Sequence, residues 1–160
     1  MVENSKNLLI KLIFLISVIA LVSAFFIEYV LGHQPCNLCI LERIPYLLAI
    51  IIILLNFKFS HYEKFFILFL SIIFLAGAII SLYHLGIEQG FVQESQVCDL
   101  KSGSNLLSKE EILKQLQEKN VSCKDVTFKI FGLSLTSYNI LVSLLITVST
   151  GKIYFNYEKN

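Results

Sequence analysis

The sequence predicts an all-α membrane protein in which four helices form a transmembrane bundle. Of its 160 residues, 56% are hydrophobic and only 16% are charged, and the mean hydropathy is +0.72. Soluble domains are about 25% charged, and a chain of this size buries only about 70% of its surface, so the excess apolar surface must face lipid. Four stretches are long enough to cross a bilayer, which takes about 20 apolar residues. The net charge of +1 argues against a nucleic-acid-binding protein.

The predicted spans cover residues 8–30, 40–57, 65–83 and 133–154 of a single membrane domain, residues 1–160. The first span carries Lys11 and Glu28 near its ends, where long charged side chains reach the interface. The second span is adequate in length only if Ile40 and Leu41 belong to it. The third span has no charge, and the fourth has only Lys152.

The first span has an alternative interpretation as a cleaved signal peptide. Val22-Ser23-Ala24 resembles a cleavage site with small residues. The apolar run continues beyond it through Phe25, Phe26 and Ile27, which makes it longer than the apolar region of a typical signal peptide. A membrane span is therefore the favoured interpretation.

Four spans place both termini on one side of the membrane and residues 31–43 and 84–132 in loops on the other side. The tight turn between the second and third spans holds Lys58 and Lys64, whereas the first loop has no lysine before Arg43. The positive-inside rule therefore places the termini in the cytoplasm. All four cysteines then lie outside, where disulfides persist.

The second loop is predicted to contain a short amphipathic helix at residues 109–119. Ser108 and Glu111 match a capping box, and Ile112 and Leu116 share one face. Two placements remain open: the helix lies on the membrane surface, or it packs on the bundle.

The four cysteines are Cys36, Cys39, Cys98 and Cys123, and the first two form a C-x-x-C motif just before the second span. Haem attachment would need His after Cys39, but the residue there is Ile40. A zinc site is disfavoured because Cys98 and Cys123 are too far apart in sequence to form a second closely spaced pair. Two structural disulfides and a redox-active pair both remain possible.

The surroundings of Cys39 favour the redox interpretation. Cys39 lies near the start of the second span, where the helix dipole favours an anion. On a continuous helix Arg43 would share its face and stabilise a thiolate. Pro45 disfavours helix at Ile44 and would break this geometry. Pairing of Arg43 with Glu42 or with lipid headgroups is an alternative.

Several segments of this sequence resemble those of a known family. Residues 34–43, Gln-Pro-Cys-Asn-Leu-Cys-Ile-Leu-Glu-Arg, are similar to the signature of the disulfide bond formation protein B family, DsbB. The resemblance extends over residues 8–154 and includes the external cysteines, the segment that leaves the third span and the segment that enters the fourth: Cys98, Cys123, residues 83–88, residues 131–134 and Asn139.

The resemblance implies a multi-pass protein of the bacterial inner membrane with its cysteine loops in the periplasm. Members reoxidise a soluble thioredoxin-like dithiol oxidase of the periplasm, a DsbA-like partner, and pass the electrons to a membrane quinone, either ubiquinone or menaquinone. The implied redox disulfides are Cys36–Cys39 and Cys98–Cys123.

The resemblance also implies roles for single residues. The partner's thiolate would attack Cys98, and Cys123 would leave and then attack Cys36. Cys39 would be released as a thiolate against the quinone, and Arg43 would stabilise the negative charge on sulfur or on a quinone oxygen. His84 and Glu88 would line the quinone pocket or handle its protons, or they are an ordinary interfacial polar pair.

Two further hypotheses stay open on the sequence alone. The chain could be a non-catalytic four-span protein held by two structural disulfides, or the same fold could reduce a quinone-type substrate for metabolic purposes. Haem ligation by His33, His61 and His84 is disfavoured, because isolated histidines near span ends usually lie at the membrane interface.

Overall fold

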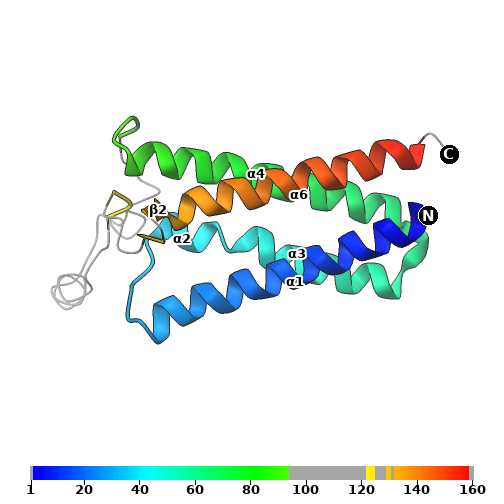
Figure 1. Cartoon of the computed structure of the whole chain (residues 1–160), viewed down its shortest axis with the longest axis horizontal. Coiled ribbons are helices and arrows are strands. Elements are labelled where there is room, and N and C mark those ends of the chain that lie inside the picture. Colours follow the sequence, from blue (N-terminus) through cyan, green and yellow to red (C-terminus); the bar gives the residue numbers. More distant parts are fainter. Residues whose placement is uncertain (1, 94–121, 125–128, 131, 159–160) are drawn as a thin grey trace, which may run out of the picture.

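The computed structural model describes residues 2–93, 122–124, 129–130 and 132–158. In this part of the chain four long helices run side by side: α1 (Val2–Tyr29), α3 (Ile44–Lys58), α4 (Glu63–Glu88) and α6 (Leu135–Glu158) (Figure 1). A short helix, α2 (Asn37–Leu41), precedes α3, and together they form the second of four stretches long and apolar enough to cross a membrane. The predicted all-α fold with four spans is confirmed.

The ends of the bundle differ. The start of α1 and the end of α6 lie at one end, whereas α2 lies at the other (Figure 1). A 3-10 turn, η1 (Ser60–Tyr62), connects α3 to α4. At the α2 end, β1 (Lys129–Ile130) and β2 (Leu133–Ser134) form a two-stranded antiparallel hairpin just before α6.

The interior of the bundle is apolar in its middle, and its outer faces are apolar too. Ala49, Ile53 and Phe74 are almost fully buried where α3 packs on α4. On the outside, Val22 and Leu145 are more than half exposed. Apolar side chains on both the inside and the outside are what a bundle surrounded by lipid requires.

One close contact sets α3 against α4. A Cβ atom on Gly77 would lie 3.0 Å from Cγ of Pro45, so only glycine permits this approach without displacing the proline ring. Small residues at helix contacts are common in membrane bundles because they let helices come close together. The contact fixes the first turn of α3, which carries Tyr46.

The third helix is longer than its apolar run. The sequence ends this span at residue 83, but α4 continues to Glu88, so His84 and Glu88 lie on the helix and not in the loop. The helix continues because these polar side chains are buried among partners and are not solvated. It stops where Gly90 takes a positive φ of 78° and Phe91 N–H donates to Gly86 O at 2.9 Å, a Schellman ending.

The second span is broken as the position of Pro45 suggested. α2 ends at Leu41, and α3 begins at Ile44 with Arg43 as its N-cap and Pro45 in its first turn. Proline fits a first turn because it has no N–H to donate there. The fourth span also starts later than residue 133, because Leu133 and Ser134 belong to β2.

Several predictions fall on residues outside those described. These are Cys98, the pairing of Cys98 with Cys123, and the amphipathic helix at residues 109–119.

Candidate functional site

Cys36 and Cys39 lie at the start of α2. The Cys36 sulfur acts as the helix cap, because it accepts a hydrogen bond from the Cys39 backbone N–H at 3.2 Å. Cys36 is 5% exposed, whereas Cys39 is partly accessible. Both are thiols, and within the described part of the chain no disulfide includes either of them. The Cys36 thiol is therefore buried, and the Cys39 thiol is partly accessible.

His84 of α4 connects the Cys36 sulfur to a carboxylate. Its Nε2 atom lies 3.5 Å from Cys36 Sγ, and its Nδ1 atom lies 2.7 Å from Oε1 of Glu42. An ionised carboxylate can only accept, so Nδ1 carries a proton and donates it to Glu42. Nε2 of a neutral ring is then an acceptor that faces the Cys36 thiol. This is the arrangement of a thiol beside an oriented base.

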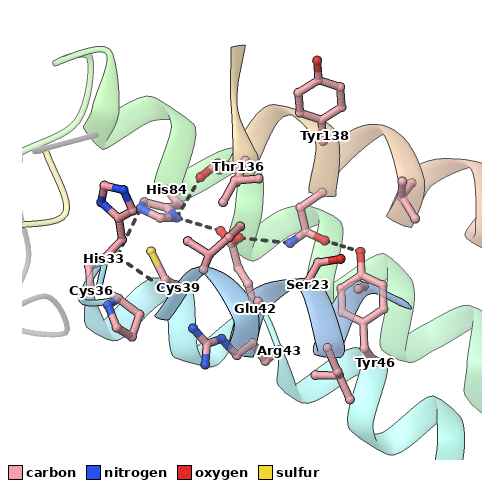
Figure 2. A pocket seen from close by; sticks show the side chains of 18 of the residues that line it. Ser23, His33, Cys36, Cys39, Glu42, Arg43, Tyr46, His84, Thr136 and Tyr138 are labelled. Atoms are coloured by element: carbon pink, nitrogen blue, oxygen red, sulfur yellow. Dashed lines mark hydrogen bonds and ion pairs between the residues drawn. The ribbon is translucent and has the colours of Figure 1, made fainter. Parts of the chain in front are cut away.

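Glu42 is itself held by residues of α6 and α3. Asn139 donates from Nδ2 to the second Glu42 oxygen at 3.0 Å and to Ser81 Oγ at 2.8 Å. The Tyr46 hydroxyl donates to Asn139 Oδ1. A continuous polar chain therefore runs from the Cys36 thiol through His84 and Glu42 to Tyr46 (Figure 2).

A second carboxylate approaches His84 from its own helix. Glu88 Oε1 lies 3.7 Å from His84 Nε2, and the side chains of these residues are 8% and 2% exposed. Thr136 donates its hydroxyl proton to Glu88 at 2.6 Å, and its oxygen lies 3.2 Å from His84 Nδ1. The side chains of His84 and Glu88 are therefore largely buried members of one network.

The pKa of the Cys36 thiol is raised above its ordinary value. The main cause is its interaction with the Cys39 side chain, and burial adds to it, while the hydrogen bond with His84 acts in the opposite direction. Cys36 is therefore a protonated thiol at neutral pH and needs a base to become a thiolate. His84 is the base placed to serve it.

Arg43 does not pair as the sequence suggested. Its guanidinium binds Glu28 Oε2 of α1 at 2.5 Å and lies over the Phe25 ring at 5.3 Å. Glu42 is directed to His84 and Asn139 instead. Because α2 and α3 are separate helices, Arg43 caps α3 and does not follow Cys39 on one helical face. Its ion pair with Glu28 links α1 to the start of α3.

The network opens on a cavity of about 570 Å³ between α1 and the other helices. Sites for small molecules usually measure about 300–1,000 Å³ and combine apolar walls with a few polar groups. Here α1 contributes mainly aliphatic side chains, and Cys36, Cys39 and His84 gather at one end (Figure 2). The polar and sulfur-bearing residues that line it include His33, Cys36, Cys39, Glu42, Arg43, Tyr46, His84, Glu88, Cys123, Thr136 and Asn139.

Comparison with known proteins identifies the family. The model of the family described as disulfide bond formation protein DsbB matches residues 6–152, nearly the whole chain. The chain belongs to the DsbB family. It is also 34% identical over 150 residues to an uncharacterized protein of Rickettsia prowazekii (strain Madrid E), covering 91% of this chain and 86% of the relative. No solved structure matches the chain.

Membership of the DsbB family confirms the predicted resemblance and gives the general role. The chain is a multi-pass membrane protein of disulfide bond formation, with the activity of a thiol oxidoreductase. The DsbB family is generally linked to quinones, which agrees with an apolar cavity beside a pair of thiols.

A third cysteine lies with the C-x-x-C pair of this DsbB-family chain. Cys123 is 3% exposed and belongs to one buried cluster with Cys36, Leu38 and Ile87, against which Cys39 packs. The structure thus brings together three of the four cysteines, although Cys123 is far from Cys36 in the sequence. Cys98 lies outside the described residues.

Sequence reasoning missed several members of this site. Thr136, Ser81 and Tyr46 were not singled out, Glu28 was assigned to the membrane interface, and Asn139 was noted only through the family resemblance. A signal was present in the fourth span, which is the least apolar of the four. Its polar residues recur at helical spacing and mark its buried face: Thr136, Asn139, Ser143, Thr147 and Thr150.

Proposed function

We propose that this protein is a quinone-linked dithiol oxidase of a bacterial inner membrane. It reoxidises a DsbA-like thioredoxin-fold partner and passes the electrons to ubiquinone or menaquinone, with the termini in the cytoplasm and the cysteine loops in the periplasm. The observation that carries the proposal is the position of His84. It lies between Glu42 and Cys36 at one end of an apolar cavity whose wall includes Cys39.

The cavity suits a quinone in size and in chemistry. A quinone has an apolar tail and a ring with two carbonyl oxygens, and it accepts two electrons and two protons when bound. The aliphatic side chains of α1 fit the tail, and Arg43 at the other end has N–H groups for a carbonyl oxygen. Cys36 and Cys39 both line this space, and Cys39 is the more accessible of the two thiols.

The first exchange occurs in the second loop. The partner's thiolate attacks Cys98 of the Cys98–Cys123 disulfide, and the sulfur of Cys123 leaves. The partner's second thiol then displaces Cys98, so the partner gains a disulfide and this chain gains two thiols. Two electrons and two protons have then moved from the partner to Cys98 and Cys123.

The second exchange moves these electrons to the C-x-x-C pair. Cys123 as a thiolate attacks Cys36 of the Cys36–Cys39 disulfide, and Cys39 leaves as a thiolate. The shared buried cluster of Cys123 and Cys36 supports this order, because the attacking sulfur needs only a short approach. Cys98 then displaces Cys36, which restores the loop disulfide and leaves Cys36 and Cys39 reduced.

In this proposal His84 accepts the proton of the Cys36 thiol. Because the pKa of this thiol is raised, its S–H proton must be removed before the Cys36–Cys39 bond can form again. His84 Nε2 is 3.5 Å away and takes that proton, and the Glu42 carboxylate at Nδ1 stabilises the resulting imidazolium. The two thiols lose two electrons and two protons in total as the disulfide returns.

Arg43 acts at the wall of the cavity. Its pairing with Glu28 neutralises much of its charge and holds α1 in place, so its remaining N–H groups provide directed donors to an oxygen of the ligand. In this proposal Arg43 is a residue of the quinone site and not an acid or a base.

The relay is tested by quinone reduction with the purified full chain. The protein is supplied with a reduced thioredoxin-like dithiol donor and quinone, and Cys39→Ser and Cys98→Ser are compared with the wild type. Loss of turnover in both variants is the expected result. A wild-type protein that does not turn over, with disulfides inert to the donor, would instead indicate structural disulfides.

A further inference from the structure

Three donor atoms of the redox site also form a set of the kind that binds a metal ion. The sulfurs of Cys36 and Cys39 and a ring nitrogen of His84 all lie within 4.8 Å of one another. They come from two elements, the start of α2 and the last turns of α4, and Cys36 and His84 are buried. Thiolate and imidazole are the ligands that zinc and other thiophilic divalent ions prefer.

We propose that the reduced protein binds one thiophilic divalent metal ion, of the Zn²⁺ or Cd²⁺ class, through Cys36, Cys39 and His84. This site goes beyond the proposed function, and it holds whichever electron acceptor the protein uses. On binding, the ion displaces one proton from each thiol and forms two metal–sulfur bonds and one metal–nitrogen bond. No electron is transferred, and two protons are released.

The spacing of the donors matches such an ion. With Zn–S of about 2.3 Å and Zn–N of about 2.0 Å, tetrahedral geometry separates sulfur from nitrogen by about 3.5 Å. The observed distance from Cys36 Sγ to His84 Nε2 is 3.5 Å. Because each pair of these donor atoms is at most 4.8 Å apart, Cys39 Sγ needs to come closer to Cys36 Sγ by at most about 1 Å and to the His84 nitrogen by at most about 1.3 Å to complete three corners of the tetrahedron.

The groups around the ligands are also those of a metal site. His84 donates from Nδ1 to the Glu42 carboxylate at 2.7 Å, and Asn139 holds the other Glu42 oxygen at 3.0 Å. Metal-bound histidines usually make this second bond to a carboxylate, which fixes the ring and strengthens its other nitrogen as a ligand. Glu88 Oε1 lies 3.7 Å from His84 Nε2 and adds a second carboxylate beside the ligating ring.

Cysteine spacing alone disfavours zinc, because Cys98 and Cys123 do not form a second closely spaced pair. The third ligand is a histidine, which the extension of α4 beyond the apolar run brings to the site.

The oxidation state controls this site. A Cys36–Cys39 disulfide has no thiolate to offer, so only the reduced protein binds the ion. A bound ion in turn occupies both sulfurs and keeps them from forming a disulfide. Excess metal therefore holds the protein in its reduced state until a chelator removes the ion.

Cobalt provides a spectroscopic test, since Co²⁺ bound by thiolates in a tetrahedral site absorbs visible light and Zn²⁺ does not. The probe is Co²⁺, titrated into detergent-solubilised full chain in which Cys98→Ser and Cys123→Ser leave one thiol pair. The expected result is one Co²⁺ per reduced protein with tetrahedral bands, which Zn²⁺ abolishes, and no bands from the oxidised protein. Bands of equal strength from the oxidised protein, or none from the reduced protein, would overturn the proposal.

Variants on the same background separate ligation from folding. His84→Gln is expected to abolish tetrahedral Co²⁺ binding, and His84→Cys to restore it with a third thiolate. Glu42→Gln, which changes only the support of His84, is expected to weaken binding by about 10- to 100-fold. His61→Gln is the matched control, because His61 is exposed on η1 at the other end of the bundle. Unchanged binding by His84→Gln would contradict the assignment of His84 as a ligand.

Discussion

The two ends of the bundle both bury charged side chains, but they use them differently. At the end with the termini, Lys6 Nζ of α1 lies 2.7 Å from Glu63 Oε2 at the start of α4, with side chains 8% and 17% exposed. At the α2 end, the pair of His84 and Glu42 is similarly close and similarly buried. The first contact links two helices, whereas the second continues to a thiol and to a cavity.

The difference shows how to tell a structural ion pair from a functional one. The contact of Lys6 with Glu63 joins an ammonium group of α1 to a carboxylate of α4. The partner of Glu42 is a histidine, whose other nitrogen faces a cysteine. The degree of burial does not distinguish the two ion pairs. They differ in the group that the contacts lead to, which at the α2 end is a thiol.

The largest expected effect comes from removing the base at the α2 end. His84→Gln keeps a similar volume but cannot take the Cys36 proton, so turnover is expected to fall by about 10²- to 10⁴-fold at neutral pH. The measurement is steady-state quinone reduction with a reduced dithiol donor. His61→Gln should retain wild-type turnover, and a His84→Gln variant with wild-type turnover would refute the role of this base.

A second substitution tests the opposite end. Lys6→Met leaves the Glu63 carboxylate without this partner, and we expect it to lower the free energy of unfolding by about 2 kcal/mol, a factor of about 30. Turnover per folded protein should not change. Denaturation in detergent measures the loss, and the double variant Lys6→Met/Glu63→Leu should recover most of it. A fall in turnover at full folding would show that the two ends are coupled.

A third comparison is between the two thiols of the C-x-x-C pair. In the reduced protein at pH 7, iodoacetamide should modify Cys39 at least about tenfold faster than Cys36, because only Cys39 is accessible and thiolate is the reactive form. Modification of Cys36 should keep increasing with pH above the ordinary thiol value of 9.0, since its pKa is raised. Mass spectrometry of the alkylated peptides gives both rates. Equal rates at pH 7 would contradict the assigned environments.

The smallest expected effect concerns the apolar interior near the terminal end. Asn56 is buried on α3, and its Oδ1 atom accepts no hydrogen bond from the described residues. Asn56→Leu removes this unsatisfied acceptor and should leave stability unchanged or raise it by about 1 kcal/mol. The same detergent denaturation reports the change. A clear loss of stability would mean that the amide has a structural role.

Much of this architecture could be predicted from the sequence. Runs of about 20 apolar residues give the spans directly, and Pro45 signalled the break between α2 and α3. The C-x-x-C motif and its distant cysteines led to the family that the comparison confirms. The spans, the proline and the motif are each local in sequence, and the distant cysteines are recognised by residue type alone, so a pattern along the chain is sufficient to find them.

The contacts between spans could not be predicted. The hydropathy pattern ends the third span before His84. Hydropathy gives a polar residue the same value whether its hydrogen bonds are made to water or to another helix. The partner of Arg43 is Glu28, which lies on the preceding span and was assigned to the interface. Such pairs depend on how the helices pack, and a single sequence does not state that packing.

The most direct test of the central claim uses the C-x-x-C pair without any protein partner. The Cys98→Ser/Cys123→Ser variant is reduced, freed of reductant and mixed anaerobically with one equivalent of ubiquinone, and then with menaquinone in a separate sample. We expect one quinol formed per protein, with the loss of two thiols and the appearance of a Cys36–Cys39 disulfide. Persistence of both thiols with neither quinone reduced would show that the C-x-x-C pair does not transfer electrons to quinone.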